Sequence, residues 1–272
     1  MSVADPVIRW LAGRGSGAHR TVLFTCLAAV VAVLVTIQLI VFLRRPMLSD
    51  NFDQPNGLIT NEFAYFNPHD PAAKVSAKWL VTSGSLFARD HAGWTGVPDR
   101  GPPGPRSANV TDSSVFRLVT RDADFQNVAV SFSLLVQRFV APPAGTNLSW
   151  QGVHVFLRYQ SPDLLYVVSV DRRDGVVVIK KKVPGGPTAG GTYFTLAMAH
   201  VPPVVGRWVQ VKASAVNNGA DVDLKVWIAG RLRLEAVDDG AGDTAPITAP
   251  GRVGLRGDYT EFMFRAFTVT RS

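Results

Sequence analysis

The chain of 272 residues is 47% hydrophobic and contains a single cysteine, Cys26, which excludes an intramolecular disulfide framework and a thiolate zinc cluster. Its formal net charge of +7 is unevenly distributed along the sequence. Residues 1–45 hold five Arg and one Asp, a net charge of +4, whereas the remaining 23 basic and 20 acidic residues give +3. Because the large C-terminal part is close to balanced, we expect no nucleic-acid partner.

The positive charge of the N-terminal part flanks an uncharged apolar stretch, residues 21–43, with the sequence TVLFTCLAAVVAVLVTIQLIVFL. A helix rises 1.5 Å per residue, so this stretch is long enough to cross a hydrocarbon core of about 30 Å. A cleaved signal peptide would need a shorter apolar region and a small-residue cleavage site, but Arg44-Arg45-Pro46 follows instead. The sequence therefore predicts one uncleaved transmembrane helix, through which the protein is attached to a membrane.

The arginines around this helix also bear on its orientation. Three precede the apolar stretch and two follow it, which favours a cytoplasmic N-terminus. We therefore expect a single-pass protein of the cell membrane with a short cytoplasmic tail at 1–20, a transmembrane helix at 21–43 and a domain outside the cytoplasm at 44–272.

The pattern changes after residue 45, where 17 of the 18 prolines and 21 of the 24 glycines occur. About a dozen short runs of alternating or β-branched residues replace any helical periodicity, and turn residues separate them. NVAVSFSLLV, GVHVFLRYQ and DVDLKVWI are examples. Such regularly spaced runs are typical of an antiparallel sandwich or barrel. The prediction is a single all-β domain.

Asp174-Gly175 lies between two alternating runs and predicts a two-residue hairpin that pairs Val170 with Ile179. A second turn at residues 161–164 would place the preceding strand beside this hairpin, with His154 opposite Asp171. Because side chains alternate between the two faces of a sheet, the polar residues of the three strands would then share one face. These residues are His154, Arg158, Gln160, Asp171, Lys180 and Lys182.

The order of several segments resembles the concanavalin A-like lectin/glucanase superfamily, in its laminin G-like and 3-keto-disaccharide hydrolase-like branches. The segments include NFDQPNGLITNEFAYFNP, WLVTSGSLFARDHAGWTG, RWVQVKASAV and GRVGLRGDYTEFMFRAFTV, and the resemblance covers roughly residues 48–271. It implies a jelly-roll β-sandwich that often binds carbohydrate on its concave sheet. These motifs specify the fold better than they specify an activity.

Two kinds of catalysis can be weighed from the residues. Retaining glucanases of the superfamily carry Glu-x-Asp-x-x-Glu on one strand, but the three glutamates here, Glu62, Glu235 and Glu261, are far apart in sequence. Uronate lyases with this fold use a Tyr or His base beside Arg, Gln or Asn, and His154, Arg158 and Gln160 are residues of those types. A solvated polar face is the simpler interpretation of the latter set.

Exposed aromatic side chains offer another way to bind sugars, because pyranose rings stack on them. Trp94, Trp150, Trp208 and Trp227 are candidates. Trp227 is the strongest of them, since it alternates with apolar residues that face the core. A structural calcium ion held by Asp50, Asp53 and Asp258 is a further expectation, because sandwiches of this kind often hold one between the chain ends. No other cofactor is expected.

These observations lead to one principal hypothesis and two alternatives. The principal hypothesis is a membrane-anchored, lectin-like domain outside the cytoplasm that binds a polysaccharide without cleaving it. If the face with Lys180 and Lys182 is the binding site, we expect the polysaccharide to be anionic. The first alternative is a polysaccharide lyase or glycoside hydrolase on the same jelly roll. The second is a structural docking subunit of an envelope complex.

Overall fold

The structure, a computed structural model, describes residues 30–33, 36, 45–97, 108–109, 112–141, 148–188 and 190–272. Pro46–Ser272 form one compact unit, distinct from Met1–Arg45. In the latter, residues 30–33 are helical. No helix among the described residues is both long and apolar enough to cross a membrane. The predicted transmembrane helix falls mostly on residues outside the described set, so the membrane anchor remains a prediction.

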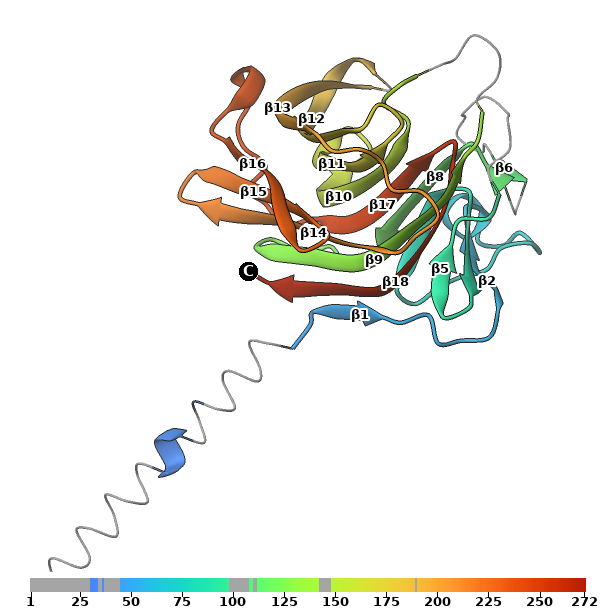
Figure 1. Cartoon of the computed structure of the whole chain (residues 1–272). Coiled ribbons are helices and arrows are strands. Elements are labelled where there is room, and N and C mark those ends of the chain that lie inside the picture. The colour runs from blue at the N-terminus through green and yellow to red at the C-terminus, as the bar shows by residue number, and fades with distance from the viewer. Residues whose placement is uncertain are drawn as a thin grey trace, which may run out of the picture. The chain divides into compact units, whose positions relative to one another are not determined.

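The compact unit consists of two packed antiparallel sheets (Figure 1). Within the described residues, sheet A has nine strands in the order β16-β15-β14-β9-β18-β5-β4-β2, with β1 also paired to β18, and sheet B has seven in the order β13-β12-β11-β10-β17-β8-β3. Each sheet also joins strands from distant parts of the sequence, such as β9 with β18 and β8 with β17. This confirms the predicted antiparallel jelly-roll sandwich.

The strands of sheet A are β1 (Leu48–Asp50), β2 (Gly57–Asn61), β4 (Ser85–Arg89), β5 (Ala92–Trp94), β9 (Val128–Phe139), β14 (Val209–Asn218), β15 (Asp221–Ile228), β16 (Arg231–Asp238) and β18 (Thr260–Arg271). Those of sheet B are β3 (Trp79–Ser83), β8 (Val115–Thr120), β10 (Gly152–Ser161), β11 (Leu164–Arg172), β12 (Val176–Thr188), β13 (Gly191–His200) and β17 (Arg252–Asp258). The remaining elements are the hairpin β6 (Ala108–Asn109) and β7 (Asp112–Ser113), the helix α2 (Phe63–Phe66) and the 3-10 turn η1 (Ala241–Asp243).

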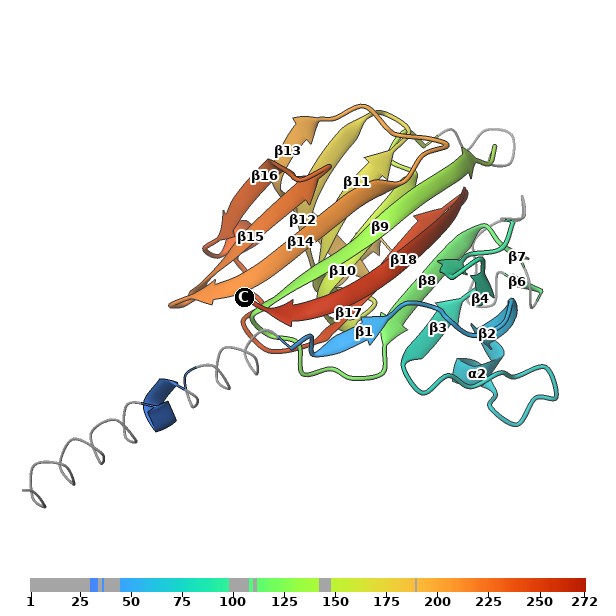
Figure 2. The same cartoon turned by 60° about the horizontal axis from the view of Figure 1, so that its bottom comes forward.

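The core lies between the two sheets, which face each other in Figure 2. Along β15, buried and partly exposed residues alternate over the whole strand, because one face meets the core and the other meets solvent. The central strands of sheet B differ, since almost every residue of β10 and β11 is buried. The outer face of sheet B is therefore also covered, and it carries a second apolar cluster that includes Val119, Phe156 and Val167.

The β11–β12 hairpin forms as predicted, but the predicted register differs from the observed one by two residues. Val168, not Val170, pairs with Ile179. The turn spans Arg172–Gly175, with the Gly175 amide donating to the Arg172 carbonyl at 3.0 Å, and Gly175 itself has a φ of +68°. A tight turn followed by a left-handed glycine replaces the two-residue Asp-Gly turn. A shift of two residues keeps each side chain on its predicted face.

Candidate functional site

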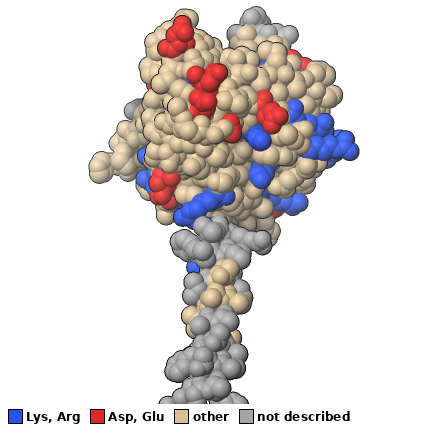
Figure 3. Space-filling view, turned by 90° about the vertical axis from the view of Figure 1, so that its left-hand side faces the viewer, with Lys and Arg blue, Asp and Glu red and all other residues tan. Residues whose placement is uncertain are grey.

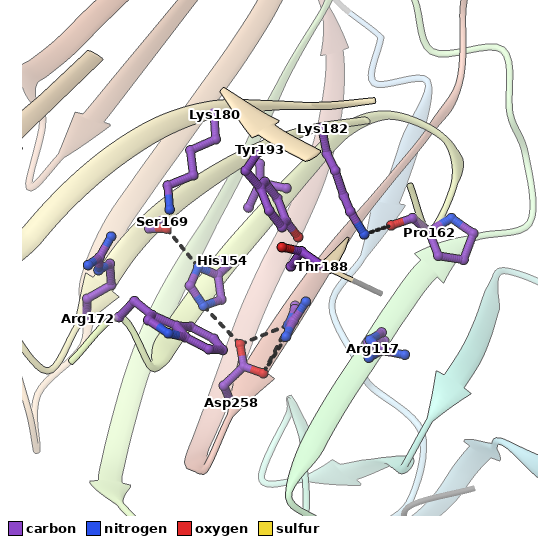
Figure 4. A pocket seen from close by; sticks show the side chains of 13 residues that line it. Arg117, His154, Pro162, Ser169, Arg172, Lys180, Lys182, Thr188, Tyr193 and Asp258 are labelled. Atoms are coloured by element: carbon purple, nitrogen blue, oxygen red, sulfur yellow. Dashed lines mark hydrogen bonds and ion pairs between the residues drawn. The ribbon is translucent and has the colours of Figure 1, made fainter. Parts of the chain in front are cut away.

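A cavity of about 290 Å³ opens on the outer face of sheet B, and we call it the sheet B cavity (Figure 4). Strands β8, β10, β11, β12, β13 and β17 all contribute to it. Figure 4 shows Lys180, Tyr193 and Lys182 on one side of the cavity, with Arg117 and Asp258 on the opposite side. The lining residues are Arg117, Trp150, His154, Pro162, Val167, Ser169, Arg172, Lys180, Lys182, Thr188, Tyr193, Arg256 and Asp258.

One row of polar side chains crosses four strands of the cavity floor. Arg117 of β8 pairs with Arg256 of β17, which in turn pairs with His154 of β10. His154 pairs with Ser169 of β11. Directly opposed residues in antiparallel strands lie about 5 Å apart, so the register alone places these four side chains side by side.

Asp258 is the single carboxylate among the described residues that line the cavity, against five Lys and Arg side chains. It is buried and bound by Arg256, whose Nε and Nη2 lie 2.8 Å and 2.7 Å from its two oxygens. Burial alone would raise the pKa of Asp258, but the Arg256 guanidinium and the His154 ring together hold it well below its usual range. Asp258 is therefore an ionised structural partner of Arg256.

His154 is 5% exposed, and both of its ring nitrogens face protein atoms. Nδ1 lies 2.8 Å from the Ser169 hydroxyl, and Nε2 lies 3.1 Å from an Asp258 oxygen. Burial lowers the pKa of His154, despite the opposing effect of Asp258. The ring is therefore neutral at pH 7 and is held by its neighbours.

The β12–β13 hairpin supplies the cationic wall of the cavity. The ammonium groups of Lys180 and Lys182 lie 5.6 Å and 5.2 Å from the centre of the Tyr193 ring. Lys182 also donates to the Pro162 carbonyl at 2.9 Å. Burial lowers the pKa of both lysines and raises that of Tyr193. The structure thus brings Lys180, Lys182 and His154 together as predicted, because the hairpin register changed by an even number of residues.

Trp150 provides an apolar surface at the rim of the cavity. It is 36% exposed, and the guanidinium of Arg256 lies 5.9 Å from the centre of its ring. An indole that is exposed beside fixed cations is suited to stack against the apolar face of a sugar whose polar groups point toward the cations.

Arg158 does not lie in the cavity, which corrects the prediction. A bulge in β10 inserts an extra residue relative to β17, and Arg158 adopts a left-handed φ of +49° there. Its side chain therefore turns away from the cavity and is fully buried, donating to the carbonyls of Gln126 and Ile247 at 3.1 Å and 2.6 Å. The next residue, Tyr159, joins the outer apolar cluster.

Asp171 is also absent from the cavity. The β10–β11 register shifts between Val153 and His154, so Asp171 pairs with Val153 and turns toward the space between the sheets. One of its oxygens accepts a hydrogen bond from the Val204 amide at 3.1 Å, and the other has no hydrogen-bond partner among the described residues. Burial raises the pKa of Asp171 to about 6, although the Val204 hydrogen bond opposes this.

The other predicted residues lie elsewhere as well. Gln160 is exposed at the end of β10, beyond the cavity. Trp227 lies on sheet A, where the Lys212 ammonium covers its ring at 4.7 Å. No cluster of three potential metal ligands occurs among the described residues, so Asp50, Asp53 and Asp258 do not converge on a calcium ion. Asp50 instead accepts a hydrogen bond from the Trp79 indole at 2.7 Å.

Arg117, Arg172, Tyr193 and Arg256 belong to the cavity but were missed in the sequence. Arg117 and Arg256 alternate with buried Leu118 and Leu255 along their strands, so an arginine at alternating spacing in an apolar strand is the signal that could have identified them. Nothing local indicates that β8 and β17 are neighbours, because about 130 residues separate them.

No protein-family model matches the chain, and no curated protein matches it. Solved structures share its fold. One, described with the endo-acting O-glycanases that members of the human gut microbiota express to initiate mucin breakdown, gives a TM-score of 0.53 at 8% identity and covers 84% of this chain and 100% of its own. A Bacillus subtilis protein of unknown function with a galectin-like fold gives 0.50 at 14%, covering 71% and 89%. An endo-1,3-β-glucanase from Streptomyces sioyaensis gives 0.50 at 10%, covering 84% and 97%. At these identities the likeness establishes the jelly-roll fold, as the sequence resemblance implied.

Proposed function

We propose that this protein is a membrane-anchored, extracytoplasmic, lectin-like protein that binds an anionic glycan in the sheet B cavity without cleaving it. The observation that carries the proposal is the composition of the cavity, in which an exposed indole lies beside five cations and a single, ion-paired carboxylate. A volume of about 290 Å³ is near the lower end of the range of small-molecule sites and suits one or two sugar rings.

Two further observations support a carbohydrate ligand. The O-glycanase and the endo-1,3-β-glucanase that share this fold act on glycans, as their descriptions state. The cavity also combines apolar groups, such as Val167, with the row of polar side chains that crosses its floor. Sugars present both kinds of surface, so such a site can bind the ring and orient its hydroxyl groups.

The absence of a second carboxylate among the described lining residues argues against glycoside hydrolysis. A retaining mechanism needs two carboxyl groups about 5 Å apart, one of which must act as an acid. Here Asp258 stands alone, and its bidentate contact with Arg256 keeps it ionised. This arrangement binds charge and does not transfer protons.

A uronate lyase is the second candidate, and Tyr193 is the observation that favours it. Its phenol faces a cavity whose arginines and lysines could neutralise a uronate carboxylate. A lyase base must lose its proton easily, however, and burial raises the pKa of Tyr193. The nitrogens of His154 are both occupied by protein atoms. Binding without catalysis is therefore the better-supported function.

The docking alternative draws on exposed apolar side chains such as Met198, Leu232 and Val237. Figure 3 shows the side of the molecule with β15 and β16, where basic and acidic residues lie close together among uncharged ones. A crevice there is lined by Asp223, Lys225 and Glu235. Because both signs of charge are mixed, this side is less suited to an anionic ligand than the sheet B cavity.

Charge reversal of the cationic wall tests the proposal. We expect Lys180→Glu combined with Lys182→Glu in the full chain, kept in mild detergent, to abolish salt-sensitive retention on alginate. Arg231→Glu with Arg233→Glu is the matched control, because it reverses two exposed charges on β16 of the other sheet. Reducing-end release measured on the retained polymer tests for cleavage. Unchanged retention in the lysine variant would overturn the proposed site, and release of new chain ends would favour an enzyme.

A further inference from the structure

Two arginines are directly opposed in the cavity floor, and only one of them has an acidic partner. Arg117 and Arg256 are register partners across β8 and β17, and both line the cavity. Like charges directly opposite each other destabilise a sheet. Asp258 neutralises Arg256, whereas Arg117 has no hydrogen-bond or ion-pair partner among the described residues.

The surroundings of Arg117 increase this imbalance. Burial and the neighbouring Arg256 both lower the pKa of the Arg117 guanidinium, with Asp258 only partly opposing them. Lys182 is a third cation of this group, and both arginines lower the pKa of its ammonium group. Among the residues that line the cavity, Arg117, Arg256 and Lys182 carry three positive charges against the one negative charge of Asp258. Asp163, which is not a lining residue, also acts on Lys182. The lining at this end of the cavity therefore carries an excess of two positive charges.

We propose that Arg117, Arg256 and Lys182 form a subsite for a doubly charged phosphomonoester on a sugar. This inference rests on the proposed function, since it names the anionic group of the glycan. A phosphomonoester dianion would balance the two excess charges, whereas a uronate carboxylate or a sulfate ester would leave one unbalanced. Its three terminal oxygens can accept hydrogen bonds from two guanidinium groups and an ammonium group at once.

Trp150 fixes where the sugar ring would lie. The Arg256 guanidinium is 5.9 Å from the indole centre, so a pyranose stacked on Trp150 has its ester group within reach of the arginine pair. Asp258 binds the Nε and Nη2 atoms of Arg256 and leaves Nη1 outside that ion pair. Asp258 is thus a positioning residue, which fixes the direction of the guanidinium without touching the ligand.

The pH dependence of binding separates the two kinds of anion. The second proton of a phosphomonoester dissociates near pH 6, whereas a uronate is ionised throughout the range from pH 5 to 7.5. Around the subsite, Arg117, Arg172, Arg256, Lys180 and Lys182 are the cations. The nearby carboxylates are Asp258, Asp163 and Asp174, the last of which forms an ion pair with Arg172. His154, with its lowered pKa, is neutral at pH 7, and Tyr193, with its raised pKa, stays protonated. The glucuronate titration over the same pH range therefore serves as the control for any change in the charge of the protein itself.

The experiment is isothermal titration of the full chain in mild detergent with glucose 6-phosphate, glucuronate and glucose. We expect glucose 6-phosphate to bind at least tenfold more tightly than glucuronate at pH 7.5, and its affinity to fall about tenfold at pH 5 as the dianion becomes scarce. Glucuronate binding should change little over the same range. Equal affinities for the two acids, with no pH dependence for the phosphate, would overturn the inference.

The Arg117→Gln variant provides a second readout. It should weaken glucose 6-phosphate binding by tenfold or more without lowering the melting temperature of the free protein, because it relieves the repulsion between the opposed arginines. Arg233→Gln on β16 removes one exposed charge from the other sheet and is the matched control. A folded Arg117→Gln protein with unchanged phosphate affinity would also overturn the inference. If the unmodified protein is retained on alginate but does not prefer glucose 6-phosphate to glucuronate, this subsite alone is rejected. If the unmodified protein binds neither alginate nor any of the three sugars, the proposed function is rejected.

Discussion

Asp171 shows how a single buried group can make stability depend on pH. The pKa of its carboxyl group is raised to about 6 from an ordinary value of 3.8, so the folded state favours the protonated form. A raised carboxyl pKa contributes stability below the ordinary value, and that contribution is lost as pH rises through 4 to 6. One pKa unit corresponds to 1.36 kcal/mol, so this group lowers the free energy of unfolding by about 2–3 kcal/mol between pH 4 and 7.

We therefore predict that Asp171→Asn raises the melting temperature by several degrees at pH 7.5 and leaves it nearly unchanged at pH 4. The amide oxygen of asparagine can still accept the hydrogen bond from Val204, so the neutral side chain retains the contact that the carboxylate makes. Thermal unfolding of both proteins across this pH range provides the measurement. An equal difference between the two proteins at every pH would show that Asp171 does not titrate near 6.

The same residue shows why part of the site could not be predicted from sequence. Strict alternation along β10 and β11 placed Arg158 and Asp171 beside His154, but a bulge or register shift near each of them turned its side chain to the other face. Neither position has the glycine that often marks such an irregularity. Lys180 and Lys182 were placed correctly because no irregularity separates them from the face of Ser169 and Val167.

At the scale of elements, a buried ion pair joins the two sheets. Lys181 of β12 and Asp238 at the end of β16 are both fully buried, with the ammonium nitrogen 3.1 Å from a carboxylate oxygen. Lys181 also donates to the Thr244 carbonyl at 2.6 Å, and the Tyr166 hydroxyl donates to Asp238 at 2.6 Å. The pair therefore connects β12 of sheet B with the last residue of β16 in sheet A.

Removing one member of this pair leaves the other charge buried without its partner. We expect Lys181→Met, which keeps an unbranched side chain one heavy atom shorter, to lower the free energy of unfolding by about 3–5 kcal/mol. The double variant Lys181→Met with Asp238→Asn should lose less than the sum of the two single variants, since it leaves no buried charge. Chemical denaturation of the four proteins measures this coupling. Strict additivity would mean that the two side chains act independently.

The elements themselves were largely predictable. The alternating runs in the sequence, such as NVAVSFSLLV, GVHVFLRYQ and DVDLKVWI, correspond to strands, because one buried face imposes a period of two on the residues. The turn at residues 161–164 was also correct, with Ser161 opposite Leu164. The Asp174-Gly175 turn was correct in place but not in type, because the dipeptide Asp-Gly is compatible with more than one loop geometry.

At the scale of the whole molecule, the proposed membrane topology makes a separate prediction. If residues 21–43 span the membrane with the N-terminus in the cytoplasm, a broad-specificity protease added to intact cells should degrade the domain that begins at residue 46. A cytoplasmic marker protein must stay intact in the same cells, and both should be degraded after permeabilisation. Protection of the domain in intact cells would reverse the topology.

Pattern alone could predict the sandwich but not the cavity. Each strand reveals its own buried face, whereas the cavity depends on which strands are neighbours, and β8, β10 and β17 come together from distant positions in the chain. Pairing of this kind is settled by the packing of the whole core. The cationic character of the site therefore emerges only once the fold is complete.

The position of β1 has a mechanical consequence. It is the first strand after residue 45, and the Met47 amide donates to the Val269 carbonyl of β18 at 2.7 Å. The indole of Trp79 and the fully buried ring of Phe52 fix the chain just beyond. Tension applied through the N-terminal segment would thus load β1 and β18 of sheet A first, while every strand of the cavity lies in sheet B. We expect the domain to retain a bound ligand when tension is applied to its N-terminal segment, because the force enters the fold through sheet A and the cavity lies on sheet B.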